Sequence, residues 1–163
     1  MNYLIIPCNL DLDTIVAMYS YYKFIEFAGF NVSCYLKHDL EDNIKSILKK
    51  LNIQFEIKSN IDINDNIILL NNAKLWLPEN ISSDQVTEII SLRLYDFSDY
   101  CNANIKQESV SLLSTLIVER YREYKLKFPN ELIALLIYLY SNCNLNLKER
   151  DKISEDYLKL LNK

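Results

Sequence analysis

Two short and wholly apolar runs, residues 3–6 and 67–70, constrain the fold of this chain more than any other feature. Stretches with apolar residues at helical spacing separate these runs from other short apolar segments. Apolar runs between helices are typical of parallel strands that are covered on both faces. We therefore predict an α/β fold, with a doubly wound, mostly parallel five-stranded sheet and helices on both faces.

The predicted strands and helices alternate along the chain of 163 residues. Asp11 and Asp13 open the first predicted helix, because acidic side chains favour a helix N-terminus, and Gly29 ends it. No repeat or linker interrupts the pattern, so residues 1–163 are predicted to form a single domain. The predicted strands are residues 3–6, 32–36, 54–57, 67–70 and 92–95, and the predicted helices are residues 12–27, 42–51, 84–90, 107–125, 129–140 and 151–161.

The composition excludes several classes of protein. Gly29 is the only glycine, so no glycine-rich phosphate loop of the P-loop or dinucleotide type is present. The net charge of −4 argues against sequence-independent nucleic-acid binding, although a local basic face leaves that alternative open. No apolar run approaches the roughly 20 residues of a membrane span. The four cysteines show no CxxC spacing, so we expect a cytoplasmic protein with reduced thiols and no membrane association.

Polar residues follow three of the predicted strands and one predicted helix. Ligands of open parallel sheets gather at the carboxyl ends of the strands, so these positions are candidates for a binding or catalytic site. We call the following seven residues the candidate cleft: Asn9, Asp11 and Asp13 after the first strand, Asn71 after residues 67–70, Asp96 and Ser98 after residues 92–95, and Cys143 after the helix at 129–140.

The order and spacing of these positions resemble the DHH phosphoesterase superfamily, and most closely the N-terminal domain of manganese-dependent inorganic pyrophosphatases. The motifs of that family are GHxNPDxD, Asp-His and Asp-His-His, and they stand here as Ile6-Pro7-Cys8-Asn9-Leu10-Asp11-Leu12-Asp13, Asn71-Asn72 and Asp96-Phe97-Ser98. Residues 114–117, 121–124 and 129–132 follow the family's next segments in order. They place Cys143, or Asn142 with a one-residue shift, where the family has a metal-binding Asp. The resemblance covers essentially the whole chain and implies a single DHH-like domain without the family's second, substrate-clamping domain.

The resemblance implies a site for two manganese ions, which activate a bridging water in that family. Asp11 and Asp13 are retained at the metal-ligand positions, whereas four other positions carry Pro7, Asn71, Phe97 and Cys143. Two carboxylates do not suffice for two divalent ions. We therefore expect no catalytic residue, metal or cofactor, and predict a non-enzymatic binding or structural subunit of a larger intracellular assembly.

Two alternatives stay open at this stage. In the first, Asp11, Asp13 and Asp96 hold Mn²⁺ or Mg²⁺ in an active phosphoesterase or pyrophosphatase with a reduced site. In the second, the candidate cleft senses a nucleotide or phosphate without hydrolysing it. Against both, the aspartates are explained as helix caps and turn residues that bind nearby backbone.

A predicted loop carries the best candidate for contact with another protein. Trp76, Leu77 and Pro78 are apolar, although they lie outside any periodic element. Such a loop either packs onto the core of its own domain or anchors a partner. We expect a protein partner or a homo-oligomer and name these three residues as its candidate contact.

Overall fold

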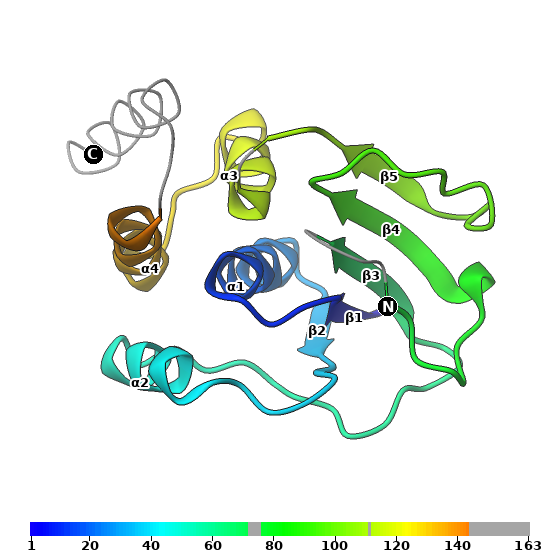
Figure 1. Ribbon diagram of the computed structural model, residues 1–163, viewed down its shortest axis with the longest axis horizontal. Coiled ribbons are helices and arrows are strands. Elements are labelled where there is room, and N and C mark those ends of the chain that lie inside the picture. Colours follow the sequence, from blue (N-terminus) through cyan, green and yellow to red (C-terminus); the bar gives the residue numbers. More distant parts are fainter. Residues whose placement is uncertain (72–75, 111, 144–163) are drawn as a thin grey trace.

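The computed structural model describes residues 1–71, 76–110 and 112–143 (Figure 1). Five strands form one sheet in the spatial order β2-β1-β3-β4-β5, and all neighbouring strands are parallel. The strands are β1 (Asn2–Pro7), β2 (Asn31–Cys34), β3 (Asn66–Asn71), β4 (Val86–Ser91) and β5 (Asn104–Gln107). The helices are α1 (Leu12–Phe27), α2 (Asp42–Lys50), α3 (Leu113–Glu123), α4 (Asn130–Asn142) and the 3-10 helix η1 (Ser83–Gln85).

The chain enters the sheet near its middle. After β1 it adds β2 on one side, then crosses back and adds β3, β4 and β5 in turn on the other side. This reversal of direction is that of a doubly wound α/β fold, as predicted. The central strands are apolar along their length because both of their faces are buried, and Ile5 lies between Cys34 and Ile68 in the register.

The two faces of the sheet are covered by different kinds of structure (Figure 1). On the face we call the helix face, Ile5, Ile68 and Ile90 pack in one cluster with buried residues of α1, α2, α3 and α4. On the opposite face, the loop face, the cluster around Leu4 and Ile6 is covered by irregular chain. The residues that cover it are Tyr35, Ile61, Trp76, Leu77, Ile81, Phe97, Tyr100 and Ala103.

The predicted α/β fold with a five-stranded parallel sheet is confirmed, and the four α-helices that the structure describes pack in the helix-face cluster rather than on both faces. Residues 84–90 were expected to form a helix, but they contain the end of η1 and most of β4. The branched side chains of Val86, Thr87 and Ile89 suit the pleated surface of a strand better than a helix. Without this helix, the connections on either side of β4 cover the loop face as loops.

Two of the five predicted strands are also wrong. Residues 92–95 lie in the loop after β4, and the fifth strand is β5, twelve positions further along. Residues 54–57 contribute only an isolated bridge between Ile57 and Cys34, which extends the sheet beyond β2. Because β5 takes residues up to Gln107, the helix expected from 107 begins only at Leu113.

The remaining helices agree with the prediction. Helix α1 matches residues 12–27, and Gly29 ends it with a φ of 83°, a conformation that favours glycine. Helices α2 and α4 agree within two residues at each end. The helix expected at residues 151–161 lies outside the described residues. In the described part of the chain, no helix is both long and apolar enough to span a bilayer.

Candidate functional site

The candidate cleft begins with a hydrogen-bonded cap at the start of α1. One carboxylate oxygen of Asp11 accepts a hydrogen bond from the backbone N–H of Thr14 at 2.8 Å. The side-chain amide of Asn9 donates to the other oxygen, and the Thr14 hydroxyl donates to the Asn9 carbonyl oxygen at 3.2 Å. Asp11 and Asn9 therefore hold the turn that leads from β1 into α1, as an N-cap does.

Asp13 caps a different helix from the one that carries it. It is buried, and its Oδ2 accepts a hydrogen bond from the backbone N–H of Leu113 at 2.6 Å. Its Oδ1 accepts from the backbone N–H and the hydroxyl of Ser114, at 3.0 and 2.7 Å. The N-cap residue of α3, Leu112, makes no side-chain cap of its own. Asp13 thus supplies the missing cap, and its charge lies at the favourable end of the α3 dipole.

The protonation of Asp13 reflects two opposing effects. Burial removes the carboxylate from water and raises its pKa above the usual value. The hydrogen bonds from Ser114 and Leu113 lower the pKa, and the nearby charge of Asp11 raises it. Burial is the largest effect, so the pKa stays raised although three donors point at the carboxylate.

Asn71 lies at the carboxyl end of β3 and is fully buried. Its amide donates to the Ser91 hydroxyl at the end of β4 at 3.1 Å. Ser91 in turn donates to the carbonyl of Arg93 at 2.9 Å and accepts from its N–H at 3.2 Å. The carbonyl oxygen of Asn71 has no donor among the described residues. Sequence analysis missed Ser91, whose only signal is its position at the end of an apolar run.

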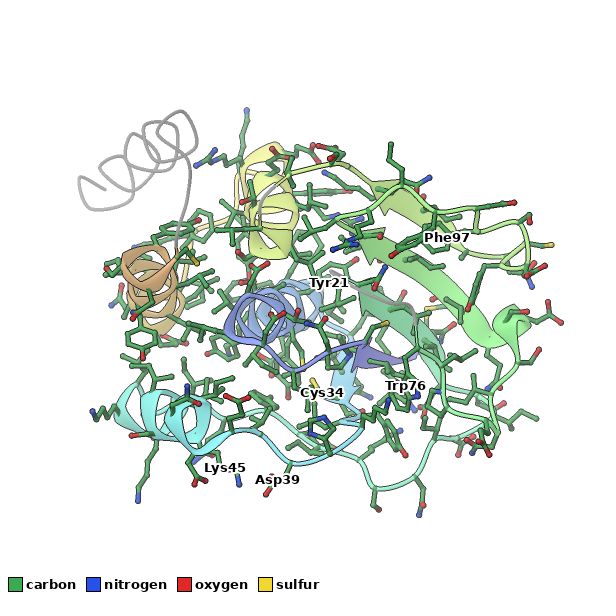
Figure 2. All side chains as sticks on the ribbon, viewed as in Figure 1. Tyr21, Cys34, Asp39, Lys45, Trp76 and Phe97 are labelled. Carbon is green, nitrogen blue, oxygen red and sulfur yellow. The ribbon has the colours of Figure 1, made fainter. Side chains whose placement is uncertain are left out.

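Asp96 and Ser98 belong to an exposed turn after β4. Asp96 accepts a hydrogen bond from the backbone N–H of Ser98 at 3.0 Å, as turn aspartates do. Phe97, between them, is buried in the loop-face cluster (Figure 2). In the described ranges, no group of three or more His, Cys, Asp or Glu side chains lies close enough to hold a metal ion. Asp11, Asp13 and Asp96 therefore do not form such a group.

A pocket lies where the starts of α1 and α2 approach α4. Its volume is about 140 Å³. We call it the acidic pocket, and its lining residues are Asp11, Leu12, Glu41, Asn43, Ile44 and Tyr138. Of these residues, sequence analysis identified only Asp11 as a site residue. The others lie on elements that are far apart in the chain, and no local pattern marks them.

Cys143 ends α4 close to the same carboxylates. Burial raises the pKa of its thiol, and the negative charges of Asp13 and Asp11 raise it further. The structure therefore brings Asn9, Asp11, Asp13 and Cys143 of the candidate cleft together in a region of negative potential. Such a region disfavours anions and favours cations.

Trp76 packs on the loop face (Figure 2). Its ring stacks on Tyr35 with the centroids 6.5 Å apart, and the Lys37 ammonium lies 5.0 Å from the ring centroid. Leu77 is half-buried and Pro78 is buried, so the segment packs onto the core of its own domain. The Cys8 thiol donates to the Trp76 carbonyl at 3.5 Å, and burial raises the pKa of this thiol to about 11.

A second polar cluster on the helix face was not expected as a unit. The Arg120 guanidinium on α3 donates to the Glu88 carboxylate on β4 and to the Tyr21 hydroxyl on α1. The Tyr21 hydroxyl donates to Glu88. Arg120 and Glu88 are 14% and 13% exposed, so their ion pair is largely removed from water. This cluster ties α1, β4 and α3 together.

Comparison with known proteins adds no assignment. No family model matches the sequence, and no curated protein is significantly similar to it. The candidate cleft must therefore be interpreted from its own geometry and from the residues that carry the resemblance described above.

Proposed function

We propose that this chain is a catalytically degenerate DHH-like domain that acts by binding, as a non-enzymatic subunit or regulator of a larger intracellular assembly. The observation that carries the proposal is the environment of Asp13. Both oxygens of this carboxylate accept hydrogen bonds from the first residues of α3, at 2.6 to 3.0 Å. A carboxylate engaged in this way holds the fold together rather than presenting open lone pairs to an ion.

The cost of converting Asp13 into a metal ligand supports the same conclusion. A metal ion at this carboxylate would displace some of its hydrogen bonds and leave α3 without its cap. Losing a helix cap alone destabilises a protein by about 1 kcal/mol, and buried N–H groups without an acceptor cost more. Among the described residues, no group of carboxylates lies close enough together to bind a metal ion and so compensate for this loss.

The remaining positions of the candidate cleft also support a binding role. Asn71 carries a neutral amide where the DHH resemblance places a carboxylate, and Asp96 is exposed in its own turn. The acidic pocket is lined by two carboxylates and by no basic side chain. A phosphate or pyrophosphate anion would be repelled there, which argues against the phosphate-sensing alternative.

A thermal-melt titration with Mn²⁺ and Mg²⁺, each with and without pyrophosphate, tests the proposal. Hydrolysis is assayed in the same samples. We expect no metal-dependent shift of the melting temperature and no release of phosphate. A metal ion raises the melting temperature only if it binds the native state, and the proposal predicts that neither ion does. Phosphate release that disappears in the Asp11→Asn variant would overturn the proposal. Asparagine is also a good N-cap, so this variant keeps the start of α1 intact.

A further inference from the structure

The two edges of the sheet end differently. At the β2 edge, the Cys34 N–H donates to the Glu56 carbonyl at 2.7 Å, and the Lys58 N–H donates to the Cys34 carbonyl at 2.9 Å. The isolated bridge between Ile57 and Cys34 lies between these bonds, so the protein's own chain covers the carboxyl end of that edge. At the other edge, β5 is the outermost strand, and no described strand pairs with its outer side (Figure 1).

The backbone of β5 leaves hydrogen-bonding groups open along its outer side. In parallel strands, the N–H and C=O of every second residue point at the same neighbouring strand. The Glu108 N–H donates to the Ser91 carbonyl at 3.1 Å, so Lys106, two residues earlier, also faces β4. Ile105 and Gln107 therefore direct their N–H and C=O groups away from β4, and in the described part of the chain these groups have no backbone partner. Such an edge is a template for a further strand.

Apolar side chains are exposed beside this edge. Ile105 is 37% exposed, and it lies in register with Ile89 of the loop-face cluster. The Tyr95 N–H donates to Oε1 of Gln107 at 3.1 Å, which places the loop of Leu94 next to β5. Leu94 is 69% exposed. A chain that pairs with β5 would cover apolar surface as well as satisfy its backbone groups.

The charges of β5 favour a second copy of the same strand as the partner. Lys106 and Glu108 are two residues apart and share one face of the strand, and Glu108 is exposed. If two copies pair antiparallel about Gln107, Lys106 of each copy lies directly opposite Glu108 of the other. These are non-hydrogen-bonded positions, where side chains come closest and opposite charges stabilise the pair. Pairing about Lys106 would instead place two lysines opposite each other.

We propose that β5 pairs antiparallel with β5 of a second copy of this chain, centred on Gln107, so that one sheet continues through both copies. The pairing uses the same edge of each copy, so the assembly closes at two copies. This inference goes beyond the proposed function and does not depend on it, because an enzyme could pair through the same edge.

Sedimentation velocity of the full chain over a series of concentrations tests the inference, and we expect a concentration-dependent dimer. Two charge reversals should break it. Glu108→Lys places two lysines opposite each other in the dimer, and Lys106→Glu places two glutamates there. Each reversal should raise the dissociation constant of the dimer about tenfold or more. An equimolar mixture of the two variants should dimerise again, because each lysine then faces a glutamate.

The mixture separates strand pairing from other effects of the variants. Mixing cannot rescue a variant that has lost its fold, or one that has lost only the ion pair between Lys106 and Glu119 at 3.5 Å. Glu56→Lys is the matched control, because it makes the same reversal at an exposed residue beside the β2 edge, and its dimer should be as tight as that of the wild type.

Three results would overturn the inference: a wild type that is monomeric at every concentration, equal weakening by Glu56→Lys and Glu108→Lys, or a mixture that does not dimerise. Each of them leaves the Asp13 argument intact. Phosphate release in the hydrolysis assay overturns the proposed function and leaves the sedimentation result valid.

Discussion

The helix face and the loop face of the sheet are stabilised by different interactions. On the helix face, polar contacts join elements that are distant in sequence, as Asp13 does with α3 and Arg120 with Glu88. On the loop face, irregular chain is held by apolar and aromatic packing around Phe97 and Trp76. Asp11 and Asp13, the acidic residues of the motif that resembles a catalytic site, therefore cap helices in this protein.

The largest loss of stability is expected on the helix face. Arg120→Ala should lower the free energy of unfolding by about 4 kcal/mol, because it leaves the Glu88 carboxylate buried without its cation. Urea unfolding measures the effect. Lys106→Ala is the control, since its ion pair with Glu119 is longer, at 3.5 Å, and more exposed. The control should lose less than about 1 kcal/mol, and similar losses would contradict the distinction.

Asp13→Ala should cost about 3 kcal/mol in the same measurement. The substitution leaves two backbone N–H groups and one hydroxyl without their acceptor, in a place that water does not reach. Asp96→Ala is the matched control, because its carboxylate caps only an exposed turn, and it should cost about 0.5 kcal/mol. If the two aspartates cost the same, the long-range cap is not the main role of Asp13.

On the loop face, Cys8 should make stability depend on pH above 9. Burial raises the pKa of its thiol from 9.0 to about 11, so the unfolded chain loses this proton first. The contribution is fully present below pH 9 and should fall by about 2 kcal/mol by pH 11. The difference between the stability curves of the wild type and Cys8→Ala isolates this effect. Parallel curves from pH 8 to pH 11 would contradict it.

The smallest expected difference concerns which face opens first. Cys8 lies on the loop face and Cys34 on the helix face, and both are buried. Loops open more readily than packed helices, so Cys8 should react with a thiol reagent in mild denaturant about tenfold faster than Cys34. The experiment uses a chain that carries both Cys101→Ser and Cys143→Ser, so that only Cys8 and Cys34 can react. Peptide mass mapping identifies which of the two is modified. Faster labelling of Cys34 would reverse the ranking of the two faces.

The parts of the fold that could be predicted from the sequence are those with a strong local pattern. The continuous apolar runs of β1 and β3 and the capped helix α1 were recognised because each is specified within a few residues. Strand β5 was missed, since three of its four residues are polar, none is buried, and they carry no strand pattern. Strand β4 was taken for a helix because its apolar residues also fit helical spacing.

The candidate site divides in the same way. The sequence placed Asn9, Asp11 and Asp13 together after the first strand, and the structure keeps them together. It could not show that Asp13 points at α3, because that contact joins residues about 100 positions apart. Glu41 and Tyr138 could not be predicted as neighbours either, since the acidic pocket forms only when α1, α2 and α4 pack together.

Helix α1 has a consequence for how the chain folds during its synthesis. Buried residues occur on all sides of this helix, and they contact strands on one side and α3 and α4 on the others. Ribosomes add about 5 to 20 residues per second, so α3 emerges roughly 5 to 20 s after α1. Until then, apolar surface that the finished domain encloses has no native cover. The newly made N-terminal half is therefore the stage at which we expect the chain to depend most on chaperones.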